Sequence, residues 1–311
     1  MLPAGHTWRR ATLDDAVAIQ AMVAEHDTAV VGYPDSTVDD IRDQLTEPGL
    51  VIDADTWVVF SEGSVVGWAW TYGRGSGEYI DLDVVTLDPA VRAFLFSAAL
   101  ARADELRAGS GHPTATIDIG VVRSNSAMAS AASEHGFHHA ATFYRMRIDH
   151  DGAPITPVAP VGVTLRSGPG DLAFRRLAHS VLTESFKGHF GYGSPIFERW
   201  HDTIEQSSVF HWSQLHLAYL DNQPAAILLT SDTFLASENC GIVDDLGVLP
   251  FARGRGIAKY LLQVAFSRDQ SANRTGTLLH VDSNNTTGAL NLYKSVGMRP
   301  ILVIDKWCKT I

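Results

Sequence analysis

The chain of 311 residues has few cysteines, no long apolar run and a deficit of basic side chains. Its only cysteines, Cys240 and Cys308, cannot form a disulfide framework or a cysteine-type zinc site. No apolar run reaches the ~18 residues that a membrane helix needs, and residues 1–14 lack the apolar core of a signal peptide. We therefore expect a cytoplasmic protein without a membrane span.

Acidic residues outnumber basic ones by 35 to 24, which gives a formal net charge of −11. This balance argues against nucleic acid or an anionic membrane as the main partner. It is compatible with a cationic substrate, and equally with a charge that serves only solubility. Two nucleotide motifs are missing as well, because the sequence has neither a G-x-G-x-x-G fingerprint at its glycine-rich turn nor any Gly-Lys dipeptide.

The sequence does contain enough apolar material for a sizeable core, since 45% of its residues are hydrophobic. Its length allows two domains of ordinary size. Residues 151–160 read D-G-A-P-I-T-P-V-A-P, with a proline at every third position. Such a segment is typical of a stiff, extended connector. We therefore predict one domain over residues 1–150, a linker over 151–161 and a second domain over 162–311.

The two halves repeat one order of elements, so we predict two copies of one α/β fold. In the first half we expect helices at 12–23, 38–45, 91–106 and 125–134, and strands at 57–61, 65–72, 79–86, 114–122 and 143–148. In the second half we expect helices at 171–184, 195–204, 257–266 and 286–296, and strands at 163–166, 214–220, 225–230, 242–249, 277–281 and 301–307.

One stretch of the second half combines a strand, a turn and a helix in a pattern that suits anion binding. Residues 242–249 are a mostly apolar strand that Pro250 ends, and R-G-R-G follows at 253–256. An apolar helical stripe then starts with Ile257 and Leu261. Backbone N–H groups of such a turn can close on a phosphate, and the helix dipole favours the negative charge. The alternative is a tight connection without a ligand.

Two motifs of this half resemble those of the GNAT superfamily of N-acetyltransferases. Residues 246–258, L-G-V-L-P-F-A-R-G-R-G-I-A, resemble the family's pyrophosphate motif, R/Q-x-x-G-x-G/A. Residues 281–298 resemble its second motif, an asparagine followed by a helix with Leu-Tyr and then Gly-Met. Residues 184–191 are similar to the substrate-side segment of tandem GNAT proteins of the mycothiol-synthase type. The resemblance implies two tandem GNAT domains of α/β (α+β) class, each with a mixed, mostly antiparallel central sheet flanked by helices.

The resemblance implies acetyl-CoA as the acyl donor. It assigns the backbone of residues 246–248 to the pantetheine arm, and the turn from Arg253 onward to the pyrophosphate, with Arg255 and Lys259 as charge partners. It places Asn285 near the pantetheine. The implied cofactor-binding residues are Leu246, Gly247, Val248, Arg253, Gly254, Arg255, Gly256, Ile257, Ala258, Lys259 and Asn285.

The resemblance also implies catalytic roles. Tyr293 is the candidate general acid, because a phenol can protonate a departing thiolate within hydrogen-bond reach. The alternative is a core tyrosine on an apolar helical stripe. Strand alternation predicts that Asp244 and Asp245 point to opposite faces, and we prefer Asp244 as the general base. A structural carboxylate, or catalysis without a strict base, are the alternatives.

Substrate-side candidates lie on the first helices of the second domain, which cover the acceptor cleft in this family. They are Glu184, His189, Phe190, Tyr192 and Trp200. Packing in the core is the alternative role for the aromatic members.

The first half departs from the family pattern where the chemistry would lie. Residues 84–95 lack the R-x-x-G-x-G turn, and Ala132 stands where the tyrosine would be. We therefore expect a degenerate domain without a working acyl-CoA site. His135, His138 and His139 have a spacing that could suggest a metal site, but they fall at a turn of this half, and we expect no metal.

These observations predict an N-acetyltransferase that moves an acetyl group to a primary amine of a small cationic metabolite or antibiotic by direct attack. Mycothiol-synthase-type acetylation of a cysteinyl amine is one alternative. A non-catalytic pseudoenzyme that binds acyl-CoA as a sensor is the other. We expect a monomer or a homodimer, and the sequence leaves the acceptor amine unnamed.

Overall fold

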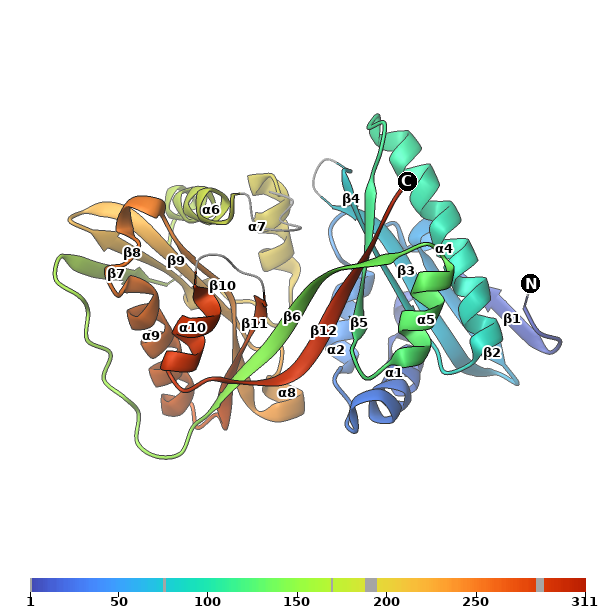
Figure 1. Cartoon of the computed structure of the whole chain (residues 1–311), viewed down its shortest axis with the longest axis horizontal. Coiled ribbons are helices and arrows are strands. Elements are labelled where there is room, and N and C mark those ends of the chain that lie inside the picture. Colours follow the sequence, from blue (N-terminus) through green and yellow to red (C-terminus); the bar gives the residue numbers. More distant parts are fainter. Residues whose placement is uncertain (1, 75–76, 169, 188–194, 284–287) are drawn as a thin grey trace. The chain divides into compact units, whose positions relative to one another are not determined.

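The computed structural model describes residues 2–74, 77–168, 170–187, 195–283 and 288–311. The chain forms two compact units, and Figure 1 labels their elements. Unit 1 comprises Met1–Thr142 and Val303–Ile311, and unit 2 comprises Phe143–Leu302. Within the described ranges, no helix is both long enough and apolar enough to cross a membrane.

Unit 1 is a sheet with helices on both faces. Its sheet has the order β1-β2-β3-β4-β5, with part of the last strand, β12, beside β5. Its strands are β1 (His6–Arg9), β2 (Thr56–Ser61), β3 (Ser64–Arg74), β4 (Tyr79–Val85) and β5 (Thr116–Val122), and β12 spans Arg299–Thr310. Its helices are α1 (Ala16–Val31), α2 (Val38–Leu45), α3 (Ile52–Asp55), α4 (Pro89–Ser110) and α5 (Ser126–Glu134), with a 3-10 turn at Leu13–Asp15.

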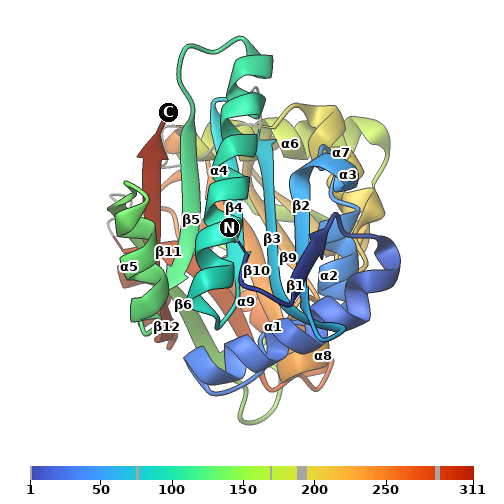
Figure 2. The same ribbon diagram turned by 90° about the vertical axis from the view of Figure 1, so that its right-hand side faces the viewer.

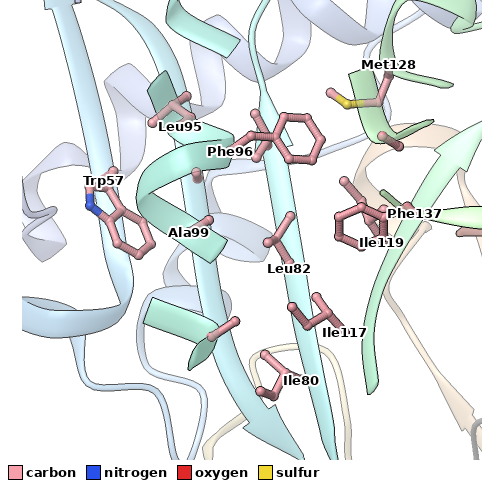
Figure 3. Close-up of a cluster of buried hydrophobic side chains, with 14 of the residues drawn as sticks. Trp57, Ile80, Leu82, Leu95, Phe96, Ala99, Ile117, Ile119, Met128 and Phe137 are labelled. Atoms are coloured by element: carbon pink, nitrogen blue, oxygen red, sulfur yellow. The ribbon is translucent and has the colours of Figure 1, made fainter. Parts of the chain in front are cut away.

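Strand alternation divides the core of unit 1 into two clusters. On one face, α4 lies along the sheet (Figure 2), and its Leu95 and Phe96 belong to an apolar cluster that extends to Ile80 and Ile117 (Figure 3). On the other face, α1 and α2 cover residues such as Trp68. Each face therefore has its own apolar layer, and neighbouring strand residues such as Val58 and Val59 enter different layers.

Unit 2 has the sheet order β7-β8-β9-β10-β11, with part of β6 beside β11. Its strands are β6 (His138–Asp149), β7 (Val163–Ser167), β8 (Leu215–Leu220), β9 (Gln223–Ser231), β10 (Cys240–Val248) and β11 (Gly276–Asp282). Its helices are α6 (Leu172–Phe186), α7 (Phe197–Gln206), α8 (Leu235–Glu238), α9 (Ile257–Ser271) and α10 (Ala289–Ser295), with 3-10 turns at Trp212–Gln214 and Pro250–Ala252. Helices α6 and α7 pack on one face of this sheet, and α9 and α10 pack on the other.

The two units exchange their closing strands, which differs from the predicted division at residues 150 and 162. Residues 143–149 of β6 pair with β11 of unit 2, although they precede the proline-rich segment. Residues 304–310 of β12 pair with β5 of unit 1, although they end the chain. Both closing pairs are antiparallel, and backbone hydrogen bonds do not depend on side-chain identity. Local patterns therefore cannot tell which sheet each closing strand joins.

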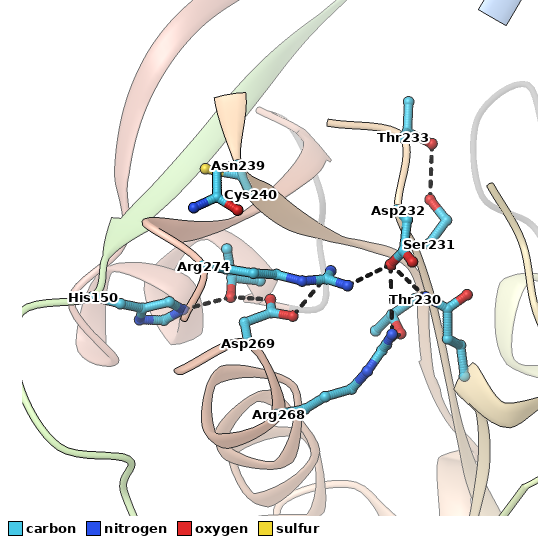
Figure 4. Close-up of polar contacts among 12 residues, drawn as sticks. His150, Thr230, Ser231, Asp232, Thr233, Asn239, Cys240, Arg268, Asp269 and Arg274 are labelled. Atoms are coloured by element: carbon cyan, nitrogen blue, oxygen red, sulfur yellow. Dashed lines mark hydrogen bonds and ion pairs between the residues drawn. The ribbon is translucent and has the colours of Figure 1, made fainter. Parts of the chain in front are cut away.

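A buried polar network holds the first residues of β10 and β11 (Figure 4). Arg274 donates to Asp232 at 2.7 Å and pairs with Asp269 at 3.2 Å. The hydroxyl of Thr277 donates to the same Asp269 carboxylate at 2.5 Å. A Cβ on Gly241 would overlap that carboxylate, so the glycine leaves the space that Asp269 needs. The network fixes α9 against both strands before the strands separate.

Candidate functional site

The parallel strands β10 and β11 separate halfway along their length. They pair with each other only as far as Val243 and Leu279. Beyond this point β10 stays paired with β9 to Val248, and β11 stays paired with β6 to Asp282. The sheet of unit 2 therefore opens between its two parallel strands, next to the strand–turn–helix segment that the sequence singled out.

A β-bulge lies at the opening. The register of β10 against β9 shifts between Val243 and Asp245, so Asp244 is an extra residue. Val243, Leu246 and Val248 pack in the same cluster under α9, which strict alternation from Val243 would forbid. The carboxylates of Asp244 and Asp245 are thus both directed to the other face, where α6 lies. The prediction that they point to opposite faces is wrong, because the bulge adds one residue to the alternation.

These two carboxylates have raised pKa values. Burial, followed by the charge of Asp245, raises the pKa of Asp244 well above its ordinary value, although a hydrogen bond from the Ser231 side chain opposes this. Burial raises the pKa of Asp245 to about 6. The side chain of Asp244 is nevertheless within reach of solvent. A carboxylate with a raised pKa binds a proton more tightly than an ordinary carboxylate does.

A cavity of about 300 Å³ lies at the open edge of β10. Residues of β10, the turn, α9 and α10 line it, together with Ser185 at the end of α6. The lining comprises Ser185, Leu246, Gly247, Val248, Ala252, Arg253, Gly254, Gly256, Ile257, Ala258, Lys259, Gly288, Ala289, Leu292 and Tyr293. The structure thus brings nearly all the predicted cofactor-binding residues together. Arg255 is not in the lining, and Asn285 lies outside the described residues.

The turn before α9 leaves helix N–H groups without a side-chain cap. Gly254 and Gly256 have φ values of +75° and +78°, in the left-handed region that glycine adopts without a steric penalty. Gly256 is the N-cap of α9 and, having no side chain, cannot bond the first amides. A Cβ on Gly254 would meet nothing within 4 Å, so the space in front of the turn is open.

The basic residues at the turn differ in their surroundings, because Arg253 bonds backbone carbonyls whereas Arg255 and Lys259 are exposed. The Nε of Arg253 donates to the carbonyl of Val248 at 3.0 Å, and its Nη2 donates to the carbonyl of Ser185 at 3.4 Å. Arg253 therefore ties the turn to the ends of β10 and α6. Arg255 and Lys259 have exposed side chains. They are the residues whose charge can meet an anion at the turn.

Tyr293 is part of the apolar core and also borders the cavity. Its side chain is only 8% exposed and belongs to the apolar cluster under α9. It also lines the cavity. Burial raises the pKa of its phenol to about 12, so the hydroxyl keeps its proton at neutral pH.

The lining residues that the sequence prediction lacks are Ser185, Ala252, Gly288, Ala289 and Leu292. A Cβ on Gly247 would lie 2.8 Å from the Cβ of Ser185 and 3.2 Å from Cε2 of Phe186, so this glycine allows α6 to approach β10. Gly288 has φ of +79° and is the N-cap of α10. The glycines themselves are visible in the sequence, but their close neighbours are not.

The predicted substrate-side residues lie in different surroundings. Glu184 is exposed and pairs with Lys187 at 3.8 Å. Trp200 is only 7% exposed and packs on Trp212, with ring centroids 5.5 Å apart, so it belongs to the core between α7 and the sheet. His189, Phe190 and Tyr192 lie outside the described residues.

Two of the three histidines whose spacing could suggest a metal site have other contacts. His135 stacks on Phe96 at 4.6 Å, and His139 contacts the hydroxyl of Thr142 at 3.0 Å. In the described part of the chain, no group of three or more His, Cys, Asp or Glu side chains could hold a metal ion.

In unit 1 the parallel strands β4 and β5 also separate, but the helix that follows, α4, begins differently from α9. Strands β4 and β5 pair in parallel only as far as Asp81 and Asp118. Helix α4 is capped by Asp88, whose carboxylate accepts from the amides of Ala90 at 2.7 Å and Val91 at 3.2 Å. In this unit a side-chain carboxylate therefore binds the first amides of α4, whereas the corresponding amides of α9 have no side-chain cap.

The sheet of unit 2 thus opens between its parallel strands beside an uncapped glycine turn. Residues 179–298 match the model of the Acetyltransferase (GNAT) family. This part of the chain is a GNAT acetyltransferase domain, which confirms the family that the sequence motifs predicted. The family's acyl donor is acetyl-CoA, as expected.

Relatives share this fold over different lengths. A mycothiol acetyltransferase from Renibacterium salmoninarum is 26% identical over 192 residues, which cover 56% of this chain and 52% of that protein. The match thus spans about half of the relative. A GCN5-related N-acetyltransferase from Sphaerobacter thermophilus has a TM-score of 0.81 at 21% identity and covers 100% of this chain and 97% of its own.

A tandem GNAT protein from the clavulanic acid biosynthesis pathway has a TM-score of 0.72 at 16% identity, with 98% of both chains covered. At these identities the structural likeness concerns the fold. It confirms the predicted class, a mixed and mostly antiparallel α/β fold in tandem GNAT form.

Proposed function

We propose that the protein is an N-acetyltransferase that moves an acetyl group from acetyl-CoA to a primary amine of a small cationic metabolite or antibiotic. The observation that carries the proposal is the cavity at the open edge of β10, which joins the uncapped turn of α9 to Tyr293. The carboxylates of Asp244 and Asp245 lie on the same strand, just before the lining residues.

The donor fits the residues present. The uncapped amides of α9, with the exposed Arg255 and Lys259, suit the pyrophosphate of the cofactor. Residues 246–248, at the edge that β11 has left, would bond the pantetheine arm. When bound, acetyl-CoA supplies an activated acetyl thioester, and the protein has to position the amine and manage two protons.

Two side chains near the open edge each carry out one of the two proton transfers. Asp244, assisted by Asp245, accepts a proton from the substrate ammonium, and the raised pKa values of the pair suit this role near neutral pH. Tyr293 keeps its proton until charge develops on the leaving sulfur, and then donates it. Acetyl transfer is direct, so no protein side chain is acylated.

We also propose that unit 1 has lost its acyl-CoA site and serves as a structural partner domain. The support is the N-cap of α4. The carboxylate of Asp88 already accepts hydrogen bonds from two of the amides that a pyrophosphate would need. Its negative charge would also repel the pyrophosphate. Residue 132, where the family's tyrosine would stand, is a fully buried alanine.

Two alternatives are specific enough to test. Acetylation of a cysteinyl amine is favoured by the 26% identity to a mycothiol acetyltransferase. A pseudoenzyme that binds acyl-CoA without transfer is the other, and the low exposure of Tyr293 agrees with that role as well.

The test measures thiol release from acetyl-CoA with a panel of primary amines that includes a cysteinyl amine. At least one amine should raise release above hydrolysis and yield a product that is heavier by one acetyl group. Asp244→Asn should lower kcat/KM by about 100- to 10,000-fold, the range expected for a lost general base. If the cofactor binds but no amine increases release, the transferase proposal fails and the pseudoenzyme remains.

A further inference from the structure

His280 is a polar residue of the open edge that no motif singles out. It follows Leu279, the last residue of β11 that pairs with β10. Leu278 packs with Ile242 on one face of the sheet, so alternation directs His280 to that same face. Its side chain reaches solvent, although protein groups surround much of the ring.

Asp244 is the matching residue on the neighbouring strand. Ile242 pairs with Leu278 and Val243 with Leu279, so Asp244 and His280 are the next residues on their strands, where pairing ends. Both are directed to the face of Ile242, away from α9. Adjacent strands are about 4.8 Å apart. The two side chains thus flank the start of the opening.

Arg145 determines which nitrogen of His280 carries the proton. It lies opposite His280 on β6, and its Nε donates to the Nε2 of His280 at 3.2 Å. The guanidinium lies 4.5 Å from the ring centroid of Phe234, and the residue is only 6% exposed. Because Nε2 accepts this bond, a neutral imidazole must carry its hydrogen on Nδ1. Burial and the charge of Arg145 lower the pKa of His280 to about 4, so the ring is neutral at pH 7.

We propose that His280 is a specificity residue of the acceptor site, which donates its Nδ1 hydrogen to a substrate oxygen on the carbon next to the one that bears the amine. The acceptor class is then an amine with a vicinal oxygen, such as an amino alcohol or an amino sugar. The inference rests on the proposed acetyltransferase function and narrows its substrate.

The chemistry of the two groups is complementary. A carboxylate at Asp244 accepts hydrogen bonds and attracts an ammonium group, whereas the Nδ1 of His280 only donates. A nitrogen and an oxygen on adjacent carbons satisfy both at once. A plain alkylamine leaves the Nδ1 hydrogen without a partner, and sites built to bond a substrate oxygen discriminate against analogues that lack it.

The experiment compares 2-aminoethanol with propylamine, which have the same number of heavy atoms and differ by a hydroxyl in place of a methyl group. The readout is the ratio of their kcat/KM values for the full-length protein. The wild type should prefer 2-aminoethanol by about 10-fold or more, which corresponds to about 1.4 kcal/mol. His280→Phe should bring the ratio close to one.

Two further variants separate the hydrogen bond from packing. His280→Asn places an amide N–H near the position of Nδ1 and should keep most of the preference. His280→Gln places its amide nearer Nε2 and should lose it. Equal acetyl-CoA affinity and equal melting temperature in all variants will show that the fold and the donor site are intact.

The outcomes distinguish this inference from the function on which it rests. If the wild type acetylates both amines equally, or if His280→Phe leaves a clear preference unchanged, the role of His280 is refuted while the transferase function stands. If neither these amines nor any other of the panel is acetylated, the transferase proposal falls and the inference falls with it.

Discussion

Tyr293 shows how one residue can belong to a core and to a site. Its ring packs among apolar residues under α9, and it also lines the cavity. Its pKa of about 12 follows from that burial. A phenol with such a pKa is a poor acid in isolation, but it remains protonated over the whole physiological range. It can therefore donate at the moment when charge develops on sulfur.

We predict that Tyr293→Phe lowers kcat by about 100- to 10,000-fold, the range for a lost general acid, and leaves acetyl-CoA affinity nearly unchanged. Phenylalanine keeps the packing and removes only the hydroxyl. Steady-state kinetics with the best amine of the panel and direct titration of acetyl-CoA will measure the two effects. An unaffected kcat would remove Tyr293 as the acid.

At the level of elements, the bulge in β10 is the feature that organises the site. Without it, Asp244 and Asp245 would lie on opposite faces, and residues 246–248 would present the wrong sides to α9. The bulge restores the apolar alternation for Leu246 and Val248 while it brings two carboxylates to one face. A change of register by one residue exchanges the faces of every later side chain in the strand.

The packing of α6 on β10 gives an element-scale prediction. Gly247→Ala should destabilise the protein by about 1–3 kcal/mol, the usual cost of overpacking, because the new Cβ overlaps Ser185. Ser185→Gly should relieve much of this cost in the double variant. Chemical denaturation of the four proteins yields the coupling energy between the two positions.

Gly120→Ala, in β5 of unit 1, is the matched control. A Cβ there would make ordinary contact with Ile304 at 3.6 Å, so stability should change little. If Gly247→Ala is tolerated as well as Gly120→Ala, the close approach of α6 to β10 is wrong.

Local patterns in the sequence predicted most helices and strands, and the exceptions have physical causes. Strand β10 and helix α9 lie within a few residues of the predicted 242–249 and 257–266. Strand β1, at His6–Arg9, was not predicted, because it is short and largely exposed and has no apolar alternation. Trp200 was assigned to the substrate side, since the sequence does not reveal that its ring packs on Trp212.

At the scale of the whole molecule, the closing strands are exchanged, because residues 143–149 of β6 pair with β11 of unit 2 and residues 304–310 of β12 pair with β5 of unit 1. The carboxylate of Asp305 on β12 accepts from Arg123 at 2.9 Å and from the hydroxyl of Thr142 at 2.7 Å, all within unit 1. These bonds lower the pKa of Asp305 to about 2, as expected for a paired carboxylate. The last residues of the chain are thus part of the first fold unit.

We predict that deletion of residues 303–311 damages unit 1 more than unit 2. Hydrogen exchange should show lost amide protection in β5, which pairs with this segment, and retained protection in the stretch of β11 that pairs with β6. A chain divided at the proline-rich segment would give the opposite pattern, with lost protection in the second half. Mass spectrometry of peptides from the two strands distinguishes these results.

The sequence by itself determined the family, the two-fold repetition and the glycine turn before α9, because each depends on residues close together in the chain. A turn needs glycines at particular positions, and a helix needs apolar residues at a particular spacing. The tertiary structure alone decided which sheet each closing strand joins, that Asp244 and Asp245 share a face, and that Asp244 and His280 follow the last paired residues of β10 and β11. These relations depend on strand register and on contacts between distant segments, which local patterns do not encode.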